Sequence, residues 1–460
     1  QITYVNNSGS GRTTLEGIRV NGDLLTDGSF FVNGNPNYTD GEESKFGADE
    51  DQSLIKCGAY TGNGSPNGPV IRLGWEPQFL LVKNIDKSQN WTILDSMRGL
   101  PTEVASADAA IYPNSNSVEE DRTILDLDST GFHPKGTGDD INGNGDQHIY
   151  IAIRFPDGYI GKPALAATDV FTVTNSPTDG LEPWQRTTNQ IVDYGIFKDR
   201  TATHGWSNSA RLMQDRLLKL NTNAAQTSHA NQVFDYMNGW NDGTDTTGNY
   251  TGWMWKRNVG FDVVTYKGDG EDGHYIEHSM NAVPEMIWVK RRNTTGQWIV
   301  GHIGLDGGTA PWTHYMTLET TDAEGDYPLF YDTAPTSKYF KVGGHAEVNG
   351  NSNEFIAMLF ASNAGISKVG YYTGNSTADR IIPTGFQPRF IIIRRCDATD
   401  NWYVIDTTRG LTKQLRINSD AGQIDTAEQI TFVSTGFQIP AAGTGPYNST
   451  DEKFIYYVHA

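Results

Sequence analysis

Oxygen ligands recur at alternate positions in one short stretch, in the spacing of a calcium-binding loop. Asp140, Asn142, Asn144 and Asp146 are separated by single Ile or Gly residues. Carboxylate and amide oxygens at this spacing, with glycines that let the backbone turn, suit a Ca²⁺ ion. The bidentate Glu expected at the twelfth position is absent, because Ile151 stands there. The stretch therefore predicts either a calcium site or an ordinary polar loop.

A second pattern places an acid three residues before an arginine at two places in the chain. The pairs are Asp95 with Arg98 and Asp406 with Arg409, each followed by Gly-Leu. Such a pair can bind a ligand, or it can form an ion pair that closes a turn in which glycine adopts the unusual dihedral angle. A catalytic pair is more typical of a single site. Because the pattern recurs at matching places, we expect structural turn pairs.

The remaining residues follow no catalytic spacing. The sequence contains no Gly-X-Ser-X-Gly, no His-Glu-X-X-His and no phosphate loop. Carboxylates are abundant, but none is singled out as a glycosidase pair. Trp240, Trp253 and Trp255 form a cluster that predicts either a sugar-stacking platform or part of a core. We therefore expect no enzymatic activity and no cofactor, with calcium as the one candidate ion.

These residues lie in a stretch that recurs along the chain. Residues 74–100 and 385–411 both run Gly-aromatic-X-Pro-X-Phe, then an apolar strand with a basic end, a polar turn, Asn-Trp, a second strand and Asp-X-X-Arg-Gly-Leu. A third copy, within 260–365, lacks the Asp-X-X-Arg-Gly turn, and a fourth, within 155–259, diverges further. Landmarks that recur in a fixed order indicate a chain built from copies of one unit.

The copies predict an all-β chain, a tandem array of four β-sandwich repeat domains after an irregular N-terminal arm. Short apolar strands alternate with turns rich in Gly, Asn, Asp, Ser and Thr. The strand after Pro-X-Phe is apolar on both faces, which predicts a position inside a sheet that is covered on both sides. The predicted boundaries are 1–56 for the arm and 57–154, 155–259, 260–365 and 366–460 for repeats 1 to 4.

Several details of this architecture have alternatives. The repeats form either a string or pairs, the first with the second and the third with the fourth. Residues 207–220 match strands by position, but their apolar residues also have helical spacing. In the arm, a strand-like piece at 29–32 precedes an acidic loop near 40–51, and the arm either packs on the first repeat or ties the chain to a neighbouring subunit. Cys57 and Cys396 lie in different repeats, so we expect two buried free thiols.

The overall composition argues against two classes of partner. The formal net charge is −20, whereas phosphate binding needs a basic surface, so no nucleic-acid partner is expected. No apolar run approaches the roughly 20 residues that span a bilayer, so no membrane span is expected. The acidic balance instead favours a solvated surface that repels like-charged neighbours.

The repeated signature resembles a repeat found in structural proteins of tailed bacteriophages, notably marine ones. It consists of Tyr-Thr-Gly-Asn-Gly, Gly-aromatic-X-Pro-X-Phe with a basic strand end, and Asn-Trp-X-hydrophobic-X-Asp-X-X-Arg-Gly. Residues 57–100 and 369–411 carry it well, and the third copy carries it in part. The resemblance implies a tail-fibre, appendage or head-decoration protein on the virion surface or in the extracellular space. It supplies no catalytic residue.

Two functional hypotheses follow from these observations. The favoured one is a non-enzymatic virion structural protein that assembles into a homo-oligomer and with other virion proteins. The acidic surface, the tandem repeats and the lack of a catalytic motif support it. The alternative is a receptor- or carbohydrate-binding module of a phage fibre or a cell-surface adhesin, for which the partner would be a host-surface glycan.

Overall fold

The computed structural model describes three short strands near the N-terminus and most of residues 55–460. The three strands form one small sheet in the order β1 (Ile2–Tyr4), β2 (Ile18–Val20) and β3 (Asp23–Leu25). The predicted strand at 29–32 and the predicted acidic loop near 40–51 lie outside the described residues. From residue 55 onward the description leaves out 67, 74, 97, 99–107, 129–130, 155–165, 177–189, 214, 230–233, 235–238, 241–248, 427–429 and 441–445.

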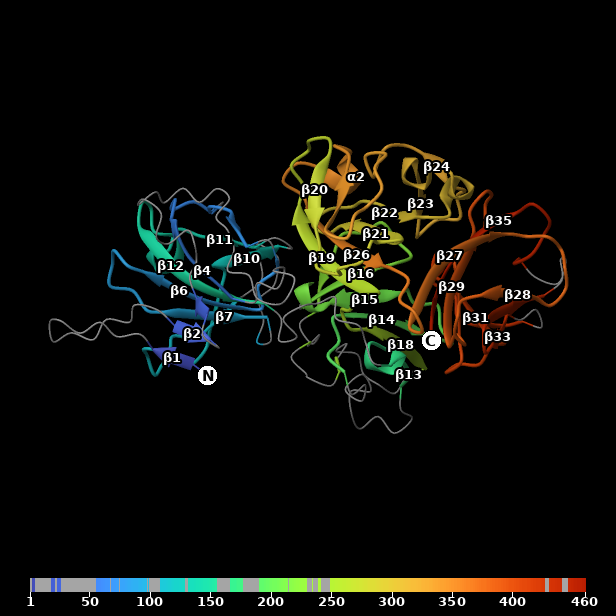
Figure 1. The fold of residues 1–460 in the computed structure, drawn as a ribbon, viewed down its shortest axis with the longest axis horizontal. Coiled ribbons are helices and arrows are strands. Elements are labelled where there is room, and N and C mark those ends of the chain that lie inside the picture. Colours follow the sequence, from blue (N-terminus) through green and yellow to red (C-terminus); the bar gives the residue numbers. More distant parts are fainter. Residues whose placement is uncertain are drawn as a thin grey trace. The chain divides into compact units, whose positions relative to one another are not determined.

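The chain is all-β, as the sequence predicts, and four of its sheets share one strand order (Figure 1). The first long strand of each predicted repeat pairs with its last strand, which pairs with the strand that follows Pro-X-Phe or its equivalent. That strand in turn pairs with the Trp strand, and every pairing in this series is antiparallel.

We number these sheets by the repeat in which they lie. Sheet 1 contains β4 (Ile55–Thr61), β12 (Gln147–Ile153), β6 (Phe79–Asn84) and β7 (Thr92–Asp95). Sheet 2 contains β13 (Phe171–Asn175), β18 (Tyr250–Trp255), β14 (Tyr194–Asp199), β15 (Ser207–Ala210), β16 (Arg216–Lys219) and β17 (Thr227–Ser228). Sheet 3 contains β19 (Phe261–Lys267), β26 (Glu354–Phe360), β21 (Met286–Arg291), β22 (Trp298–His302), β23 (His314–Thr317) and β24 (Gly325–Asp326). Sheet 4 contains β27 (Ser367–Thr373), β35 (Lys453–His459), β29 (Phe390–Arg395), β30 (Tyr403–Asp406), β31 (Lys413–Arg416) and β32 (Ile424–Asp425).

Smaller elements complete the repeats. Small sheets in repeat 1 are β10 (Leu125–Asp128), β11 (Gly131–Pro134) and β5 (Ile71–Arg72), and β8 (Asp108–Ala110) with β9 (Glu120–Arg122). Repeat 3 adds β20 (His274–Glu277) with β25 (Tyr339–Val342), and repeat 4 adds β28 (Arg380–Pro383), β34 (Gly436–Ile439) and β33 (Thr431–Val433). The helices among the described residues are single turns, namely α1 (Asp139–Asn142), α2 (Ala346–Asn349), and the 3₁₀ turns 167–169, 211–213, 305–308 and 311–313.

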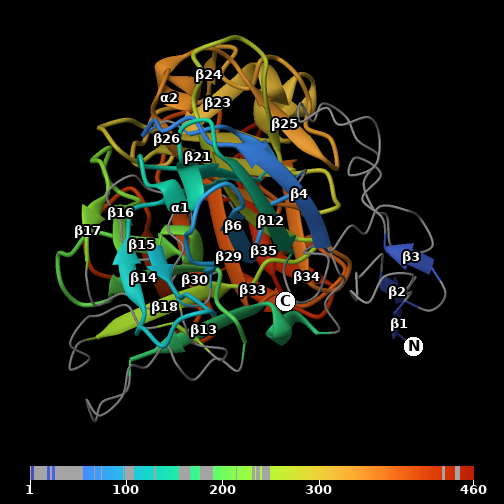
Figure 2. The same cartoon turned by 90° about the vertical axis from the view of Figure 1, so that its left-hand side faces the viewer.

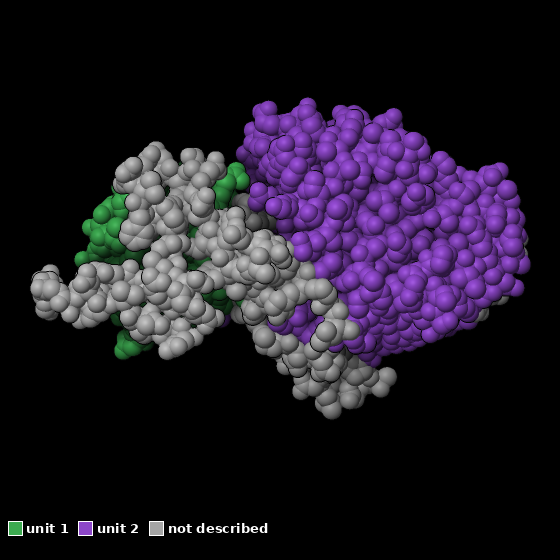
Figure 3. All heavy atoms as spheres, viewed as in Figure 1, with its two compact units in different colours: residues 1–95, 107–126, 131–159 green, residues 96–106, 127–130, 160–460 purple. Residues whose placement is uncertain are grey.

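The chain divides into two compact units, which Figure 3 shows in different colours. Unit 1 holds residues 1–95, 107–126 and 131–159, and unit 2 holds residues 160–460 with 96–106 and 127–130. Unit 2 therefore contains sheets 2, 3 and 4. The packing inside unit 2 differs from a string of separate sandwiches, because the inner faces of these three sheets share one core.

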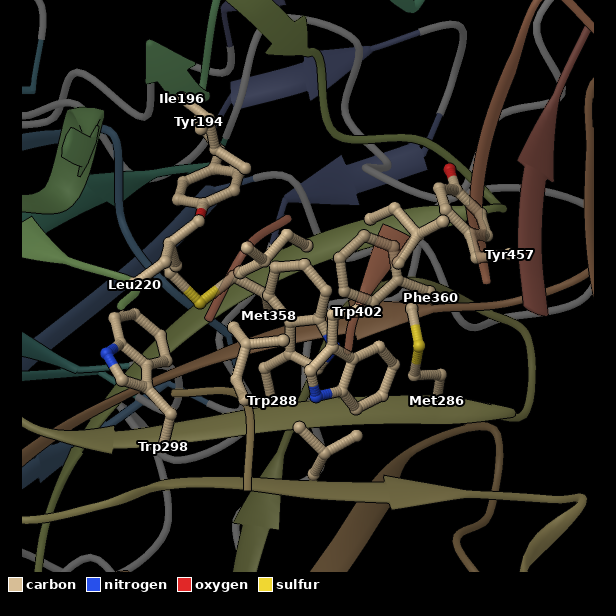
Figure 4. Close-up of a cluster of buried hydrophobic side chains, with 14 of the residues drawn as sticks. Tyr194, Ile196, Leu220, Met286, Trp288, Trp298, Met358, Phe360, Trp402 and Tyr457 are labelled. Atoms are coloured by element: carbon tan, nitrogen blue, oxygen red, sulfur yellow. The ribbon is translucent and has the colours of Figure 1, made fainter. Parts of the chain in front are cut away.

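The inner core of unit 2 draws side chains from each of its three sheets. In Figure 4, aromatic side chains from all three repeats point toward one another, with Met286 and Met358 of repeat 3 among them. Alternation along β29 explains the arrangement, since Phe390 and Ile392 face the inner core while Ile391 and Ile393 face a separate outer core. The β-branched run of this strand favours the extended backbone and fills both faces. Equivalent outer cores lie in repeats 2 and 3.

Tryptophan indoles form a closed ring of hydrogen bonds among these sheets. Trp402 of sheet 4 donates its indole N–H to the carbonyl oxygen of Thr317 in repeat 3, at 3.0 Å. By the same contact, Trp298 of sheet 3 donates to Lys219 in repeat 2 at 2.9 Å, and Trp206 of repeat 2 donates to Arg416 in repeat 4 at 2.8 Å. Each acceptor is the last residue of its strand. The ring therefore closes after three sheets.

A ring of backbone hydrogen bonds runs through the same three interfaces in the opposite sense. The amide of Glu324 in repeat 3 donates to Cys396 in repeat 4 at 2.8 Å. The other two bonds run from Gln226 to Arg292 at 2.8 Å and from Gln423 to Arg200 at 2.7 Å. Each of the three interfaces is thus the same contact made by equivalent residues.

Residues 207–220 take the strand alternative rather than the helix. They form β15, one 3₁₀ turn at Arg211–Met213, and β16. The apolar residues with helical spacing are divided between two cores instead, since Leu220 packs in the inner core and Leu217 in the outer core of repeat 2.

We predict that Trp402→Phe lowers the stability of unit 2 by about 1–3 kcal/mol, because the indole donor to Thr317 is lost at a buried site. Trp288→Phe is a matched control. Trp288 is equally buried, but its indole nitrogen has no hydrogen-bond partner among the described residues. Thermal unfolding of the two variants checks this, and an equal loss in both would show that the hydrogen bond contributes nothing.

Candidate functional site

Three of the four predicted calcium ligands, Asp140, Asn142 and Asp146, form hydrogen bonds or ion pairs with other protein groups. Asp140 forms an ion pair with Arg122, and Asp146 accepts hydrogen bonds from Asn84 at 2.9 Å and forms an ion pair with Lys87 at 3.0 Å. Across the described ranges, no group of three or more His, Cys, Asp and Glu residues is arranged to hold a metal ion. No metal site is proposed for this stretch.

Asn142 holds a loop through side-chain hydrogen bonds, and an equivalent asparagine does the same in repeat 4. The side-chain nitrogen of Asn142 donates to the carbonyls of Ser65 and Gly136, both at 2.8 Å, while its oxygen accepts from the amide of Asn63 at 3.0 Å. Asn448 holds the corresponding loop of repeat 4 with a 3.1 Å bond from the amide of Asn375. The amide side chain thus fastens the Gly-Asn loop that follows the first strand.

The tyrosine of the Tyr-Thr-Gly-Asn motif fastens the same corner. Tyr60 donates its hydroxyl proton to the carbonyl of Ile141 at 2.6 Å, and Tyr372 donates to Tyr447 at 2.7 Å. The glycine is required because a Cβ at Gly62 would lie 2.3 Å from the carbonyl oxygen of Gly143. The most recognisable part of the signature is therefore a folding element.

The second turn pair forms a buried ion pair. The Nε of Arg409 lies 2.7 Å from Asp406, and neither side chain is exposed. Asp406 also accepts a hydrogen bond at 3.2 Å from the indole of Trp253, a residue of sheet 2. The pair therefore closes its own turn and joins two sheets. In repeat 1, Asp95 is the last residue of β7 and Arg98 lies half-buried in the turn after it.

The tryptophan cluster lies inside the protein. Trp240, Trp253 and Trp255 are at most 1% exposed. Trp253 and Trp255 belong to the inner core of unit 2, and Trp240 belongs to the outer core of repeat 2. The sugar-platform interpretation is wrong for these three residues, because their faces are covered by other side chains.

One surface hollow in repeat 3 does expose an aromatic ring. Its volume is about 600 Å³, and its lining residues are Gly270, Glu271, Asp272, Tyr327, Gly344, His345 and Ala346. Tyr327 is 48% exposed and packs edge-on against His345, with ring centres 5.3 Å apart. The hollow therefore combines an aromatic face with two acidic residues.

Basic residues at the ends of the central strands connect the sheets, a role that the sequence analysis did not assign. Arg394 donates to the carbonyls of Thr317 and Thr320 in repeat 3, at 3.0 and 3.1 Å. Lys290, at the same strand position, donates to Asn223 in repeat 2 at 3.1 Å. Burial lowers the pKa of Arg394 to about 10 and that of Lys290 to about 8. The recurring basic strand end was the signal in the sequence.

In sheets 2, 3 and 4 the backbone amide of the equivalent tryptophan donates a hydrogen bond to a polar side chain that lies just after the next strand. Asn418 accepts from Trp402 at 2.9 Å, and Asn221 accepts from Trp206 at 2.9 Å. In sheet 3 the acceptor is a carboxylate, Glu319, which receives the amide of Trp298. Burial raises the pKa of Glu319 to about 7.

The inner face of sheet 1 differs in burial from the inner faces of the sheets in unit 2. Along β4, β6 and β12, alternate residues are buried on the outer face, while those on the inner face are half-buried or exposed. In β14, which is the equivalent of β6, all six residues are buried. Figure 2 shows β4, β12 and β6 side by side. The apolar residues among those half-buried or exposed on this face are Ile55, Cys57, Ala59, Phe79, Leu81, Trp91, Ile93, Ile149, Ile151 and Ile153.

The two cysteines consequently differ. Cys396 lies in the inner core of unit 2, where burial raises its pKa to about 12, while Cys57 is exposed. The prediction of two buried thiols is therefore wrong for Cys57, because this residue lies on the exposed face of β4.

We predict that Glu319→Asn stabilises the protein at pH 8 and not at pH 4. The pKa of Glu319 is raised on folding, so the wild-type side chain stabilises below its unfolded pKa and loses that contribution as pH rises to about 7. Asparagine is the acceptor in the other sheets and carries no charge. Chemical denaturation across this pH range tests the prediction, and a variant that is less stable than wild type at pH 8 contradicts it.

We predict that Asp406→Ala costs about 3–5 kcal/mol, because it leaves the Arg409 guanidinium buried without its partner. Asp425→Ala is the control, since Asp425 is 70% exposed in its ion pair with Lys413 and should cost within about 0.5 kcal/mol. Urea unfolding of both variants provides the measurement. Similar losses in the two would contradict a structural role specific to the buried pair.

Comparison with known proteins identifies a family but no activity. No curated protein matches the chain. No helix in the described ranges has the length and apolar character needed to cross a bilayer. A family model described as a domain of unknown function, DUF7483, matches residues 5–155 and 192–460, which is most of the chain. The chain therefore belongs to the DUF7483 family.

Proposed function

We propose that this protein is a non-enzymatic structural component of a tailed-bacteriophage virion, in a capsid-decoration or tail and fibre position, where it assembles with itself and with other virion proteins. The observation that carries the proposal is the use of one sheet as a building block. Three sheets already pack face to face through equivalent residues, and the fourth has an apolar inner face that is half-buried or exposed. Surfaces of this kind are typical of association sites.

Further support comes from the distinctive residues of the signature. Where the structure describes them, they serve folding: Tyr60 and Asn142 fasten a loop, and Asp406 with Arg409 closes a turn. The resemblance of the signature to phage structural repeats then favours a virion location over other assemblies. The net charge of −20 suits a solvated particle surface.

The second candidate is the glycan-binding module, and the hollow of repeat 3 favours it. An exposed aromatic ring beside carboxylates is a common way to stack a sugar ring and bind its hydroxyls. The hollow offers Tyr327 for stacking and Glu271 with Asp272 as acceptors. A glycan array with the full chain tests this, with Tyr327→Ala expected to abolish any binding. Tyr275→Ala, an exposed tyrosine outside the lining, is the control.

The virion role is tested on particles of the phage that encodes the chain. We expect the protein to co-purify with particles at a fixed copy number and to appear as surface density in an electron-microscopy map. Quantitative mass spectrometry of gradient-purified particles measures the copy number. Absence of the chain from purified particles would overturn the proposal.

A further inference from the structure

The ring in unit 2 leaves no position for a fourth sheet. Each inner face already meets two neighbours, and both hydrogen-bond rings close after sheets 2, 3 and 4. The side chains on the outer faces of these sheets are buried in the outer core of each repeat. The inner face of sheet 1, which is half-buried or exposed, is therefore a candidate surface for a contact of the same kind.

The residues on that face match those that pack the inner core of unit 2. The strand registers align Phe79 with Phe390, because Phe79 lies opposite Ile153 as Phe390 lies opposite His459. The same registers align the exposed Cys57 with the buried Val369. Apolar side chains that are buried between sheets in unit 2 thus have apolar counterparts in sheet 1 that are still open to water.

Sheet 1 also carries the residues that correspond to the donors and acceptors of the tryptophan ring in unit 2. The amide of Trp91 donates to Asn114 at 2.9 Å, as that of Trp402 donates to Asn418. This sets the tryptophan at the same point of the sheet, yet its indole nitrogen makes no hydrogen bond with any described residue and its ring is half-buried. By the same alignment, Tyr112 stands at the acceptor position that Arg416 holds in repeat 4.

The backbone ring has its counterparts at the edge of sheet 1. Ile85 aligns with the acceptor Cys396, and Glu119 aligns with the donors Gln423 and Glu324. Ile85 is 55% exposed, and Val118, beside Glu119, is 82% exposed. The expected acceptor carbonyl therefore belongs to an exposed apolar residue, Ile85, and the expected donor amide of Glu119 directly follows another, Val118.

We propose that three copies of the chain associate through the inner faces of sheet 1, in a three-fold ring that repeats the packing of unit 2. Each Trp91 indole donates to the Tyr112 carbonyl of the next subunit, and each Glu119 amide donates to the Ile85 carbonyl of the subunit before it. The contact joins two different surfaces, so it forms rings or filaments and not two-fold dimers. Unit 2 shows that this contact closes at three.

This inference deepens the self-assembly part of the proposed function and rests on it in that respect. The two are separable by experiment. Loss of the protein from virions with the trimer intact would remove only the virion role, and a monomer within intact virions would remove only the trimer.

The native mass of the full chain tests the trimer, by light scattering coupled to size exclusion at micromolar concentration. We expect three times the 50.7 kDa of one chain. Ile151→Glu places a charge at the centre of the inner face and should weaken association by at least about tenfold, with a monomer at the same concentration. Ile381→Glu is the control, because Ile381 is 49% exposed on β28 of repeat 4, and it should stay trimeric.

Thiol labelling provides a readout that does not depend on a variant folding. In the wild-type trimer Cys57 is covered and should react with a thiol reagent at least about tenfold more slowly than in the urea-unfolded chain. Trp91→Phe should weaken the trimer while circular dichroism stays unchanged. A wild-type monomer or dimer, a trimer that survives Ile151→Glu, or a fully reactive Cys57 in the native protein would each overturn the proposal.

Discussion

Every long sheet of this chain carries two apolar faces, and both must be removed from water. The loops and small sheets of a repeat cover the outer face alone, as the outer cores of repeats 2, 3 and 4 show. In sheets 2, 3 and 4 the inner face is covered by the other two sheets. Unit 2 thereby gathers three inner faces into one core, and apolar burial of this kind is the dominant favourable term in folding.

The polar contacts of unit 2 follow from that packing. A donor or acceptor at the edge of a dry core costs free energy unless it finds a partner. The indoles of Trp206, Trp298 and Trp402 therefore meet backbone carbonyls of the adjacent sheet. Where the residue differs between repeats, as with Lys290 and Arg394, the donor changes but the target remains a backbone carbonyl, which every residue supplies.

The local part of the fold was predictable from the sequence. Strand pairing within a repeat depends on the alternation of apolar and polar residues, on the turns, and on the Pro-X-Phe segment that begins a strand. The all-β class and the buried β29 strand follow from such patterns. The sequence did not reveal that three sheets share a core. The Ile391–Ile393 run predicts that both faces of the strand are covered, but it does not identify the elements that cover them. Cys57 illustrates the limit, because its residue type predicts burial and the structure shows it exposed.

The candidate sites show the same limit. Oxygen atoms at alternate positions from Asp140 to Asp146 suit a metal loop, yet an amide such as Asn142 uses the same atoms to bind backbone groups. Only the surrounding chain decides between the two. The recurrence of the Asp-X-X-Arg pair, as Asp95 with Arg98 and Asp406 with Arg409, was more informative than the oxygen spacing. A feature present in two copies of a repeat is expected to serve the fold that the copies share.

The closed ring has a consequence for the order in which the protein is made. The contact between Trp206 and Arg416 joins residues 210 positions apart, whereas the other two links connect successive repeats. During synthesis, sheets 2 and 3 emerge with inner faces that stay open to water until sheet 4 follows. Contacts so distant along the chain form slowly, because loop closure costs entropy before any burial compensates. The shared core of unit 2 is therefore incomplete until β35 takes its place between β27 and β29.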